Sequence, residues 1–420
     1  VVDVVTAADI PGENNAGPVI HDEPLLADGT ILFPGQALFC VFAETRLAAR
    51  KAARLFTLES TELPALTTVD EAVEAHSFLH GPLVFERGDV SKAIEDADHS
   101  SSSRLYIGGQ EHFYLEGQGS LALPSADGLH IISSTQHPSE IQDLVAEALN
   151  ISAAEVTVEV RRMGGAFGGK ETQAAPLSII AALGANRTGR AVRFRLDRDD
   201  DFVLTGKRHD FRADIRVGFD ASGLIKGVDG ILASRCGYGH DLSRAINDRA
   251  MFHADNAYFY PALELTSLRA KTHTVSNTAF RGFGGPQGMM LAERLVDKVA
   301  AAVHRDPLDV RLANLYNETD RSVTPYGMTI EDNVLPQLMP QLAETSDYRA
   351  RRAAIIDANA SAGRSPVRRG IALTPVRFGI SFTTSFLNQA GALINIYKDG
   401  SILLNHGGTE MGQGLFVKVA

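Results

Sequence analysis

Apolar positions along the chain change their spacing several times, which predicts a mixture of short strands and helices. Short apolar runs, typical of strands, occur at residues 31–33, 38–42 and 156–160. Longer runs, in which alanine or charged residues separate the apolar positions, are typical of helices. They cover residues 46–54, 140–149, 178–183, 289–303 and 349–356. This mixture predicts an α+β fold.

Turn signals join some of these segments. Asp220-Ala221-Ser222-Gly223 predicts the turn of a long hairpin, and Asp399-Gly400 predicts the turn of a shorter one between residues 393–397 and 402–404. Pro138 and Pro307 stand where the first turn of a helix tolerates proline, so we expect helices to begin there.

Two segments divide the chain by composition. Residues 98–103 contain a serine run, which packs poorly and predicts a boundary, and residues 361–366 are rich in turn formers. We therefore expect a small α+β region at 1–95, a large second region at 104–345 and a third at 366–420. A chain of 420 residues can bury several cores.

Composition excludes several classes of function. The formal net charge of −11 argues against a nucleic-acid-binding protein. No apolar run approaches the ~18–20 residues that span a bilayer, so we expect a cytoplasmic protein without a membrane segment. Cys40 and Cys236 are too few and too far apart for a disulfide framework, a zinc site or iron–sulfur ligation, and are expected to be small core residues.

Three glycine-rich loops of similar chemistry are the main functional signal. They are residues 164–171 (GGAFGGKE), 280–288 (FRGFGGPQG) and 406–414 (HGGTEMGQG), which we call the first, second and third glycine loops. Glycine permits positive φ and close backbone approach, so such loops present amide N–H groups to an anionic or polar ligand. Three of them suggest that separate segments converge on one large cofactor.

A nucleotide-binding P-loop is the alternative for the first glycine loop. Gly164, Gly169 and Lys170 fit G-x-x-x-x-G-K between a predicted strand and a predicted helix. The next residue is Glu171, however, where a P-loop requires a serine or threonine hydroxyl for Mg²⁺. The carboxylate would repel phosphates, so we do not favour this alternative.

The glycine loops, together with residues 108–116 (GGQEHFYLE), resemble in order and spacing the molybdenum-cofactor subunit of the xanthine dehydrogenase and aldehyde oxidase family. The resemblance covers essentially the whole chain. It implies an α/β hammerhead domain at 1–95, a first molybdenum-cofactor-binding domain at 104–345 and the beginning of a second at 366–420. It also implies that the chain, which begins at Val1 and stops at Ala420, is incomplete at both ends.

The resemblance implies roles for residues of the loops. Gln136 would donate a hydrogen bond to the apical oxo ligand of molybdenum, and Phe167 and Gly168 would bring the backbone close to the metal. Arg281 would lie beside the cofactor. Gly412 and Gln413 would contact the pterin and its phosphate. Gln136, Phe167 and Arg281 therefore form the expected environment of the molybdenum.

Five further residues would bind substrate. Glu171 and Arg249 match the carboxylate and guanidinium that xanthine dehydrogenases place against a purine, where aldehyde oxidases tend to have apolar residues. A carboxylate can hydrogen-bond a ring N–H, and an arginine can stabilise charge that develops on the heterocycle. Phe283 and Phe382 match two rings that hold the flat substrate, and Thr383 would offer a hydroxyl to it.

The implied reaction is hydroxylation of hypoxanthine and xanthine with water as the oxygen source. The general-base glutamate of the family would lie beyond Ala420, so Glu171 and Arg249 would only assist. Two [2Fe–2S] clusters and FAD would be carried by partner domains or subunits, and a dimer is expected. The alternatives are a related hydroxylase acting on aldehydes or other N-heterocycles, and an inactive scaffold.

Overall fold

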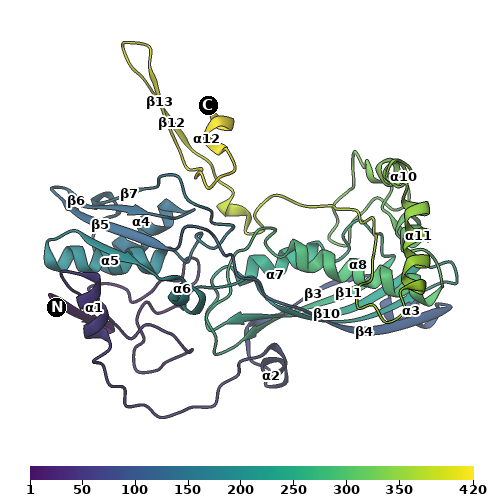
Figure 1. Cartoon of the computed structure of the whole chain (residues 1–420), viewed down its shortest axis with the longest axis horizontal. Coiled ribbons are helices and arrows are strands. Elements are labelled where there is room, and N and C mark those ends of the chain that lie inside the picture. Colours follow the sequence, from purple (N-terminus) through teal and green to yellow (C-terminus); the bar gives the residue numbers. More distant parts are fainter.

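The computed structural model describes all residues, 1–420, and shows two bodies side by side with a C-terminal segment that crosses them (Figure 1). Each body has its own apolar core of 25 buried residues. Successive segments of the chain belong to one body and then to the other. It contributes residues 1–53 and 119–195 to the first body, and residues 69–107 and 211–315 to the second.

The first body rests on a four-stranded sheet of order β7-β6-β5-β8. Its strands are β5 (Gly119–Ser125), β6 (Gly128–Ser133), β7 (Val156–Glu159) and β8 (Val192–Arg195). Helices α4 (Pro138–Leu149) and α5 (Ala175–Thr188) pack on this sheet. Helix α5 is buried along ten of its residues because alanine, leucine and isoleucine occupy its whole circumference.

The N-terminal residues belong to the same body. Strands β1 (Asp3–Thr6) and β2 (Phe39–Phe42) form an antiparallel pair, followed by α1 (Arg46–Ala53). The ring of Phe42 lies against Gly184 of α5, where a Cβ would come within 2.3 Å of it. The hammerhead-like region is therefore packed onto a helix that lies more than 130 residues further along the chain.

The second body is a five-stranded sheet of order β3-β11-β10-β9-β4. Its strands are β3 (Phe78–Arg87), β4 (His99–Ile107), β9 (Phe211–Phe219), β10 (Ile225–Gly237) and β11 (Ala262–Lys271). One face carries α7 (Ser243–Phe252), α8 (Gly285–Ala302) and α9 (Pro307–Asn314) over the main core. The other face carries α2 (Val69–Glu74) and α3 (Val90–Glu95), because Ala233 and Ala262 point oppositely to their core neighbours Leu232 and Leu263.

Helix α6 (Arg198–Leu204) lies between β8 and β9, and the remaining helices and strands follow α9. They are α10 (Leu335–Thr345), α11 (Tyr348–Ser361), β12 (Ala392–Ile396), β13 (Ile402–His406) and α12 (Leu415–Val419), and three short 3-10 turns lie at Ala7–Asp9, Ala153–Glu155 and Ser385–Leu387. The β12–β13 hairpin projects away from both bodies (Figure 1). No helix combines the length and the apolar character needed to cross a bilayer.

Most predicted elements are confirmed, including both hairpins and the helices that begin at Pro138 and Pro307. Two expectations were wrong. The serine run, expected to pack poorly, lies in edge strand β4 (residues 99–107), which pairs through its backbone with β9. Residues 31–33 form no strand, and the ring of Phe33 stacks on that of Tyr238 at 4.8 Å. The domain boundary expected at residue 95 stays a prediction, although β3 and α3, which precede that residue, pack in the second body.

Candidate cofactor and substrate site

The three glycine loops meet where the two bodies adjoin. The first glycine loop connects β7 to α5, the second precedes and opens α8, and the third connects β13 to α12. Arg281 of the second loop donates its backbone N–H to the carbonyl of Phe167 at 2.9 Å. Met163, just before the first loop, donates its N–H to the carbonyl of Glu410 at 2.8 Å. The convergence expected from the sequence is therefore present as direct backbone contacts.

Gln136 lies just before α4 and is tied to the first glycine loop. Its Oε1 accepts the backbone N–H groups of Gly168 at 2.9 Å and Lys170 at 3.4 Å. These two donors fix which end of the amide is oxygen. The Nε2 group donates to no group of the chain, so the side chain offers a positioned donor to a ligand that accepts hydrogen bonds.

Phe167 and Gly168 form the tip of the first loop with φ values of 57° and 99°. Glycine at 168 is required by space as well as by conformation, because a Cβ would come within 2.7 Å of the Ala279 carbonyl oxygen. The ring of Phe167 is 42% exposed beside this contact. Because the backbone at Phe167 has positive φ and its ring is partly exposed, a large ligand could approach the loop closely here.

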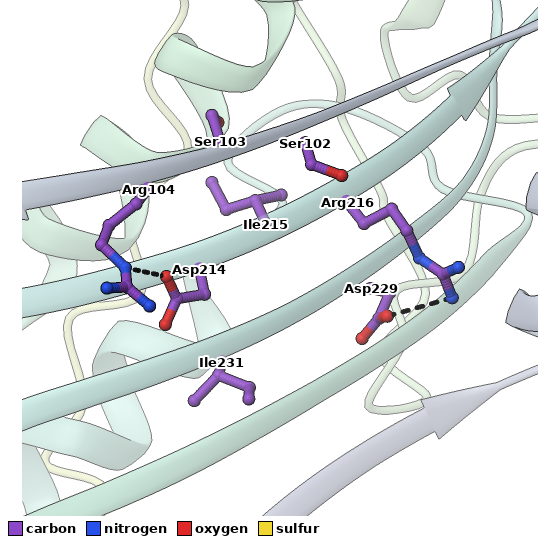
Figure 2. A pocket seen from close by; sticks show the side chains of 8 residues that line it. All are labelled: Ser102, Ser103, Arg104, Asp214, Ile215, Arg216, Asp229 and Ile231. Carbon is purple, nitrogen blue, oxygen red and sulfur yellow. Dashed lines mark hydrogen bonds and ion pairs between the residues drawn. The ribbon is translucent and has the colours of Figure 1, made fainter. Parts of the chain in front are cut away.

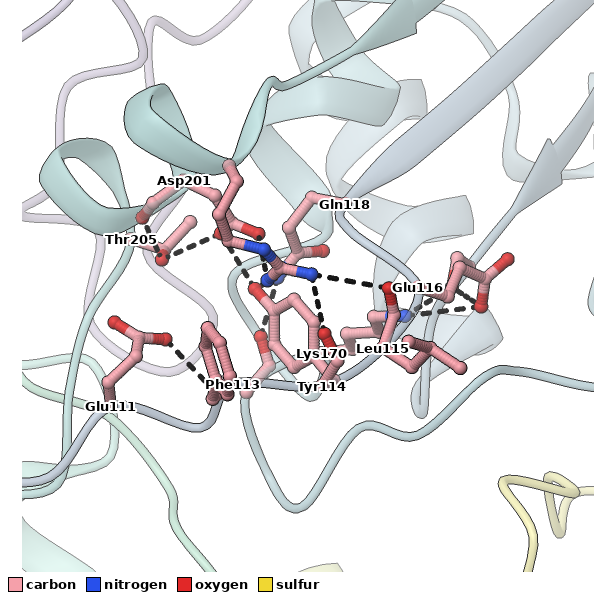
Figure 3. Close-up of polar contacts among 12 residues, drawn as sticks. Glu111, Phe113, Tyr114, Leu115, Glu116, Gln118, Lys170, Asp201 and Thr205 are labelled. Carbon is pink, nitrogen blue, oxygen red and sulfur yellow. Dashed lines mark hydrogen bonds and ion pairs between the residues drawn. The ribbon is translucent and has the colours of Figure 1, made fainter.

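A buried polar network holds the first loop from behind (Figure 3). Lys170 is completely buried, and its Nζ lies 3.2 Å from a Glu116 carboxylate oxygen and 2.9 Å from Ser134 Oγ. The Tyr114 hydroxyl donates to Asp201 at 2.7 Å. Because Lys170 is committed to Glu116, it is not available to phosphates, which agrees with the exclusion of a P-loop.

The remaining predicted cofactor residues, Arg281, Gly412 and Gln413, differ in exposure and in hydrogen bonding. Arg281 is exposed at the second loop, and its side chain forms no ion pair. Gln413 closes its own loop, accepting from Met411 N at 2.7 Å and donating to the Thr409 carbonyl at 2.9 Å. Gly412 has a φ of 107° and open space where a Cβ would stand. The roles predicted for Gln413 and Gly412 stay predictions.

Glu171 is half-buried at the end of the first loop, and its carboxylate receives no hydrogen bond from the chain. Burial, followed by the neighbouring charges of Glu140 and Asp241, raises its pKa to about 7. Near neutral pH the group is therefore divided between a form that donates and a form that accepts a hydrogen bond. No ion pair within 4.0 Å joins Glu171 to Arg249.

Arg249 lies on α7, is only 4% exposed and has no carboxylate partner. Its guanidinium donates to the carbonyls of Gly379 and Ser381 and lies 5.7 Å from the centroid of the Phe283 ring. Burial lowers its pKa. The Phe283 and Phe382 rings lie 5.2 Å apart at 54°. These three predicted residues are thus brought together.

Thr383 lies next to Phe382, but its hydroxyl donates to the backbone carbonyl of Ala245 at 3.0 Å. The segment that carries Phe382 and Thr383 is therefore anchored on α7 by Thr383 and by Arg249. The predicted contact of Thr383 with substrate stays a prediction.

Sequence reasoning missed several residues that build the site. Asp241 is buried between the two bodies and accepts hydrogen bonds from Thr172, Gln173 and Thr278 at 2.6–2.8 Å. The ring of His112 stacks on Phe280 at 4.5 Å, and its Nε2 lies 2.7 Å from the Ala279 carbonyl. The GGQEHFYLE motif contained His112, but nothing in the sequence indicated its partners.

Two of the hollows on the surface differ in their position relative to the glycine loops. One, of about 450 Å³, lies on the outer face of the five-stranded sheet, where Arg104 pairs with Asp214 and Arg216 with Asp229 (Figure 2). Its charges satisfy one another, and it lies away from the glycine loops. The other, of about 510 Å³, lies beside the first glycine loop and is lined by Glu116, Met163, Arg161, Arg162, Arg193 and Arg195, among others.

Comparisons with known proteins agree with this geometry. A molybdopterin cofactor-binding domain matches residues 73–315, and a second one matches residues 341–420. The chain belongs to the molybdopterin cofactor-binding domain family. The a/b hammerhead domain of aldehyde oxidase and xanthine dehydrogenase matches residues 1–64 of this molybdopterin-binding chain. We therefore propose that the boundary after the hammerhead domain lies near residues 65–72, and not at 95.

Individual relatives cover the chain almost completely. It is 41% identical over 415 residues to a xanthine dehydrogenase of Dictyostelium discoideum, and 41% identical over 427 residues to a nicotinate hydroxylase of Emericella nidulans. These alignments include 99% and 100% of the chain but only about 30% of each relative. Quinoline 2-oxidoreductase of Pseudomonas putida shares the fold, with a TM-score of 0.83, 22% identity, and coverage of 98% of this chain and 56% of that one.

The residues present fit a molybdopterin cofactor. Gln136 supplies an unused amide donor, and the N–H of Gly282 donates to no group of the chain. The loops have left-handed glycines at 168, 282 and 412. Amide donors on such loops suit an anionic, oxygen-rich ligand.

Proposed function

We propose that this molybdopterin-binding chain is part of a molybdenum hydroxylase that oxidises purines, hypoxanthine to xanthine and xanthine to urate, with water as the oxygen source. The observation that carries this proposal is the buried Arg249, which has no carboxylate partner, beside the Phe283 and Phe382 rings, together with the unpaired carboxylate of Glu171 at the end of the first glycine loop. A purine is flat and has ring N–H groups and carbonyl oxygens along its edge. Each of these features has a complementary group among the four residues.

The chain's own residues would bind and orient the substrate. Phe283 and Phe382 would hold the ring plane, since aromatic pairs favour stacked and edge-on contacts. Glu171, with its pKa raised to about 7, would hold a proton at a ring nitrogen. Arg249, which no carboxylate neutralises, would stabilise negative charge as it develops on the heterocycle.

The bound cofactor would supply the two-electron oxidation and the oxygen transfer. Gln136 would orient it through its free Nε2, Arg281 would lie beside it near the molybdenum, and Gly412 and Gln413 would contact its pterin part. We further propose that a general-base glutamate outside this chain, two [2Fe–2S] clusters and FAD on partner domains or subunits complete the enzyme, and that it assembles as a dimer. Relatives more than three times as long as this chain support the presence of further domains.

A nicotinate-type hydroxylase is the second candidate, because a nicotinate hydroxylase is as similar to this chain as the xanthine dehydrogenase. A carboxylate substituent on the substrate ring could pair with Arg249. Glu171 would then have to be protonated to avoid repulsion, so turnover of an anionic substrate should rise as the pH falls below about 7.

A substrate panel on the full-length protein tests the proposal. Xanthine, hypoxanthine, nicotinate and an aromatic aldehyde are compared for the wild type, Glu171→Gln and Arg249→Met. Losing either group should reduce kcat/KM for xanthine by roughly 5- to 150-fold, equivalent to about 1–3 kcal/mol. The aldehyde, which needs neither group, serves as the internal control. Equal losses on the purines and the aldehyde would assign both residues to the fold or the cofactor, and wild-type turnover of nicotinate alone would favour the second candidate.

A further inference from the structure

Five arginines are buried almost completely: Arg208, Arg212, Arg249, Arg269 and Arg311. Three of them have a carboxylate partner. Arg212 lies 2.6 Å from Asp70, Arg269 lies 2.5 Å from Asp248, and Arg311 lies 2.8 Å from Glu293. Arg208 and Arg249 have none. The chain thus compensates buried guanidinium groups where they serve the fold and leaves two uncompensated.

Arg249 lies among the residues proposed to bind substrate, but Arg208 does not. Arg208 precedes β9 and lies behind the second glycine loop. Its Nε donates to Gln110 Oε1 at 2.6 Å, its Nη2 donates to the carbonyl of Arg281 at 3.0 Å, and its guanidinium stacks 3.8 Å from the centroid of Phe280. Its Nη1 is buried without a partner.

The carboxylates near Arg208 are already paired. Glu111 lies 2.7 Å from Lys207, and Asp210 lies 2.9 Å from Arg235. Burial alone lowers the pKa of Arg208, to about 10, so the group remains positive at neutral pH. An isolated buried charge costs several kcal/mol unless an opposite charge or strong hydrogen bonds compensate it. A chain with a net charge of −11 could have placed a carboxylate here.

The hydrogen bond from Arg208 also orients the second glycine loop. In a trans peptide the C=O of Arg281 and the N–H of Gly282 point in opposite directions. Because Arg208 holds the Arg281 carbonyl, the N–H of Gly282 points away from Arg208, and it donates to no group of the chain. The guanidinium therefore polarises a peptide whose free donor is offered to a ligand on the other side.

We propose that Arg208 is the protein's fixed countercharge for the anionic molybdenum cofactor, acting through the Arg281–Gly282 peptide and through its own field. Arg208 is thus a positioning residue, since its guanidinium lies behind the loop. In the cofactor-free protein its charge is uncompensated and destabilising. Binding of the anionic cofactor relieves that cost, so cofactor affinity and the stability of the loaded protein are coupled to this charge. The inference requires cofactor binding only and is independent of the substrate.

The experiment uses the full-length protein in cofactor-loaded and cofactor-free forms. The variants are Arg208→Met, which removes the charge, Arg208→Lys, which keeps it, and Arg269→Met, the matched control in which a paired buried arginine is lost. The first measured quantity is the difference in Tm between the cofactor-loaded and cofactor-free forms of each variant. The second is the rate at which the loaded protein loses molybdenum after dilution into buffer without cofactor. In general, two unit charges on the order of 10 Å apart in a medium of effective dielectric constant about 20 change an equilibrium constant by roughly tenfold.

We expect Arg208→Met to narrow the Tm difference and to speed molybdenum loss by roughly tenfold. Arg208→Lys should retain most of the wild-type difference, and Arg269→Met should lower both Tm values together. The proposal is overturned if Arg208→Met behaves like Arg269→Met, or if Arg208→Lys loses as much as Arg208→Met. If Arg208→Met does not fold, Arg208→Gln, which keeps amide donors without charge, is judged by the same criteria.

Discussion

Gly168 lies directly against the backbone carbonyl of Ala279, which joins the first glycine loop to the chain entering the second. The contact is as close as the absence of a side chain permits. Two segments more than 100 residues apart can therefore pack this closely only if residue 168 is glycine.

Gly168→Ala should therefore destabilise the full-length protein and reduce its molybdenum content. The φ of 99° costs an alanine about 1–3 kcal/mol, and the clash at 2.7 Å adds to this. Gly189→Ala is the matched control, because Gly189 has a φ of 65° with nothing within 4 Å. Denaturant unfolding and metal analysis compare the two. Equal stability losses with equal molybdenum content would show that the Ala279 contact is unimportant.

Gln136→Glu should distinguish the role of the accepting oxygen of Gln136 from that of its donating NH2 group. The carboxylate can still accept the N–H groups of Gly168 and Lys170, but the donor that faces the proposed cofactor is lost. We expect Tm to change little while kcat falls on the order of 100-fold, as when one preorganised donor is removed from a reacting site. Gln142→Glu on α4, whose amide donates to Ala153 and Val156, should lower Tm without a comparable loss of kcat.

The Lys170–Glu116 pair should respond asymmetrically to substitution. Glu116→Gln leaves a completely buried ammonium without its anion, whereas Lys170→Met leaves a carboxylate that is 43% exposed and can reach water. We expect Glu116→Gln to cost more, with both losses about 1–3 kcal/mol after allowance for screening at Glu116. Denaturant unfolding of the single and double variants checks this. A double variant that loses the full sum of the two costs would contradict direct coupling.

Stability should fall as the pH rises from about 5 to 8. Burial, with a contribution from Asp241, raises the pKa of Glu23 to about 8, so the native state holds a proton that the unfolded chain releases above its ordinary pKa. The neutral form is favoured in the fold, and the advantage is lost progressively through this window. Glu23→Gln should flatten the dependence, measured by denaturant unfolding at several pH values. An unchanged slope would assign the dependence to other groups.

The sequence allowed the site to be predicted wherever local chemistry carries the signal. Glycines with positive φ mark the loops, so the convergence of the loops could be expected from their shared chemistry, whereas the roles of Gln136, Arg281 and Arg249 came from the resemblance to the family and stay predictions. Arg208 could not be recognised in this way. What distinguishes it from Arg269 is the absence of a carboxylate across the fold, and the sequence does not show which carboxylates are already paired.

The same limit explains the errors in the fold. The serines of β4 were expected to pack poorly because their side chains are small and polar, but the strand is held by backbone pairing with β9. The domain boundary expected at residue 95 stays a prediction, but the two cores divide the chain at other positions. Local composition shows no break between residues that pack in different cores, since the packing partners lie far along the chain.

The alternation of the chain between the two bodies has a mechanical consequence. The chain passes between the two bodies three times, at residues 54–68, 108–118 and 196–210. The second connection contains His112 and the third contains Arg208. Cutting any one connection leaves two others in place, so the halves cannot drift apart as hinged domains can. The three connections thereby restrict changes in the distance between the two bodies. A ligand that contacts both bodies therefore binds between surfaces whose separation varies little.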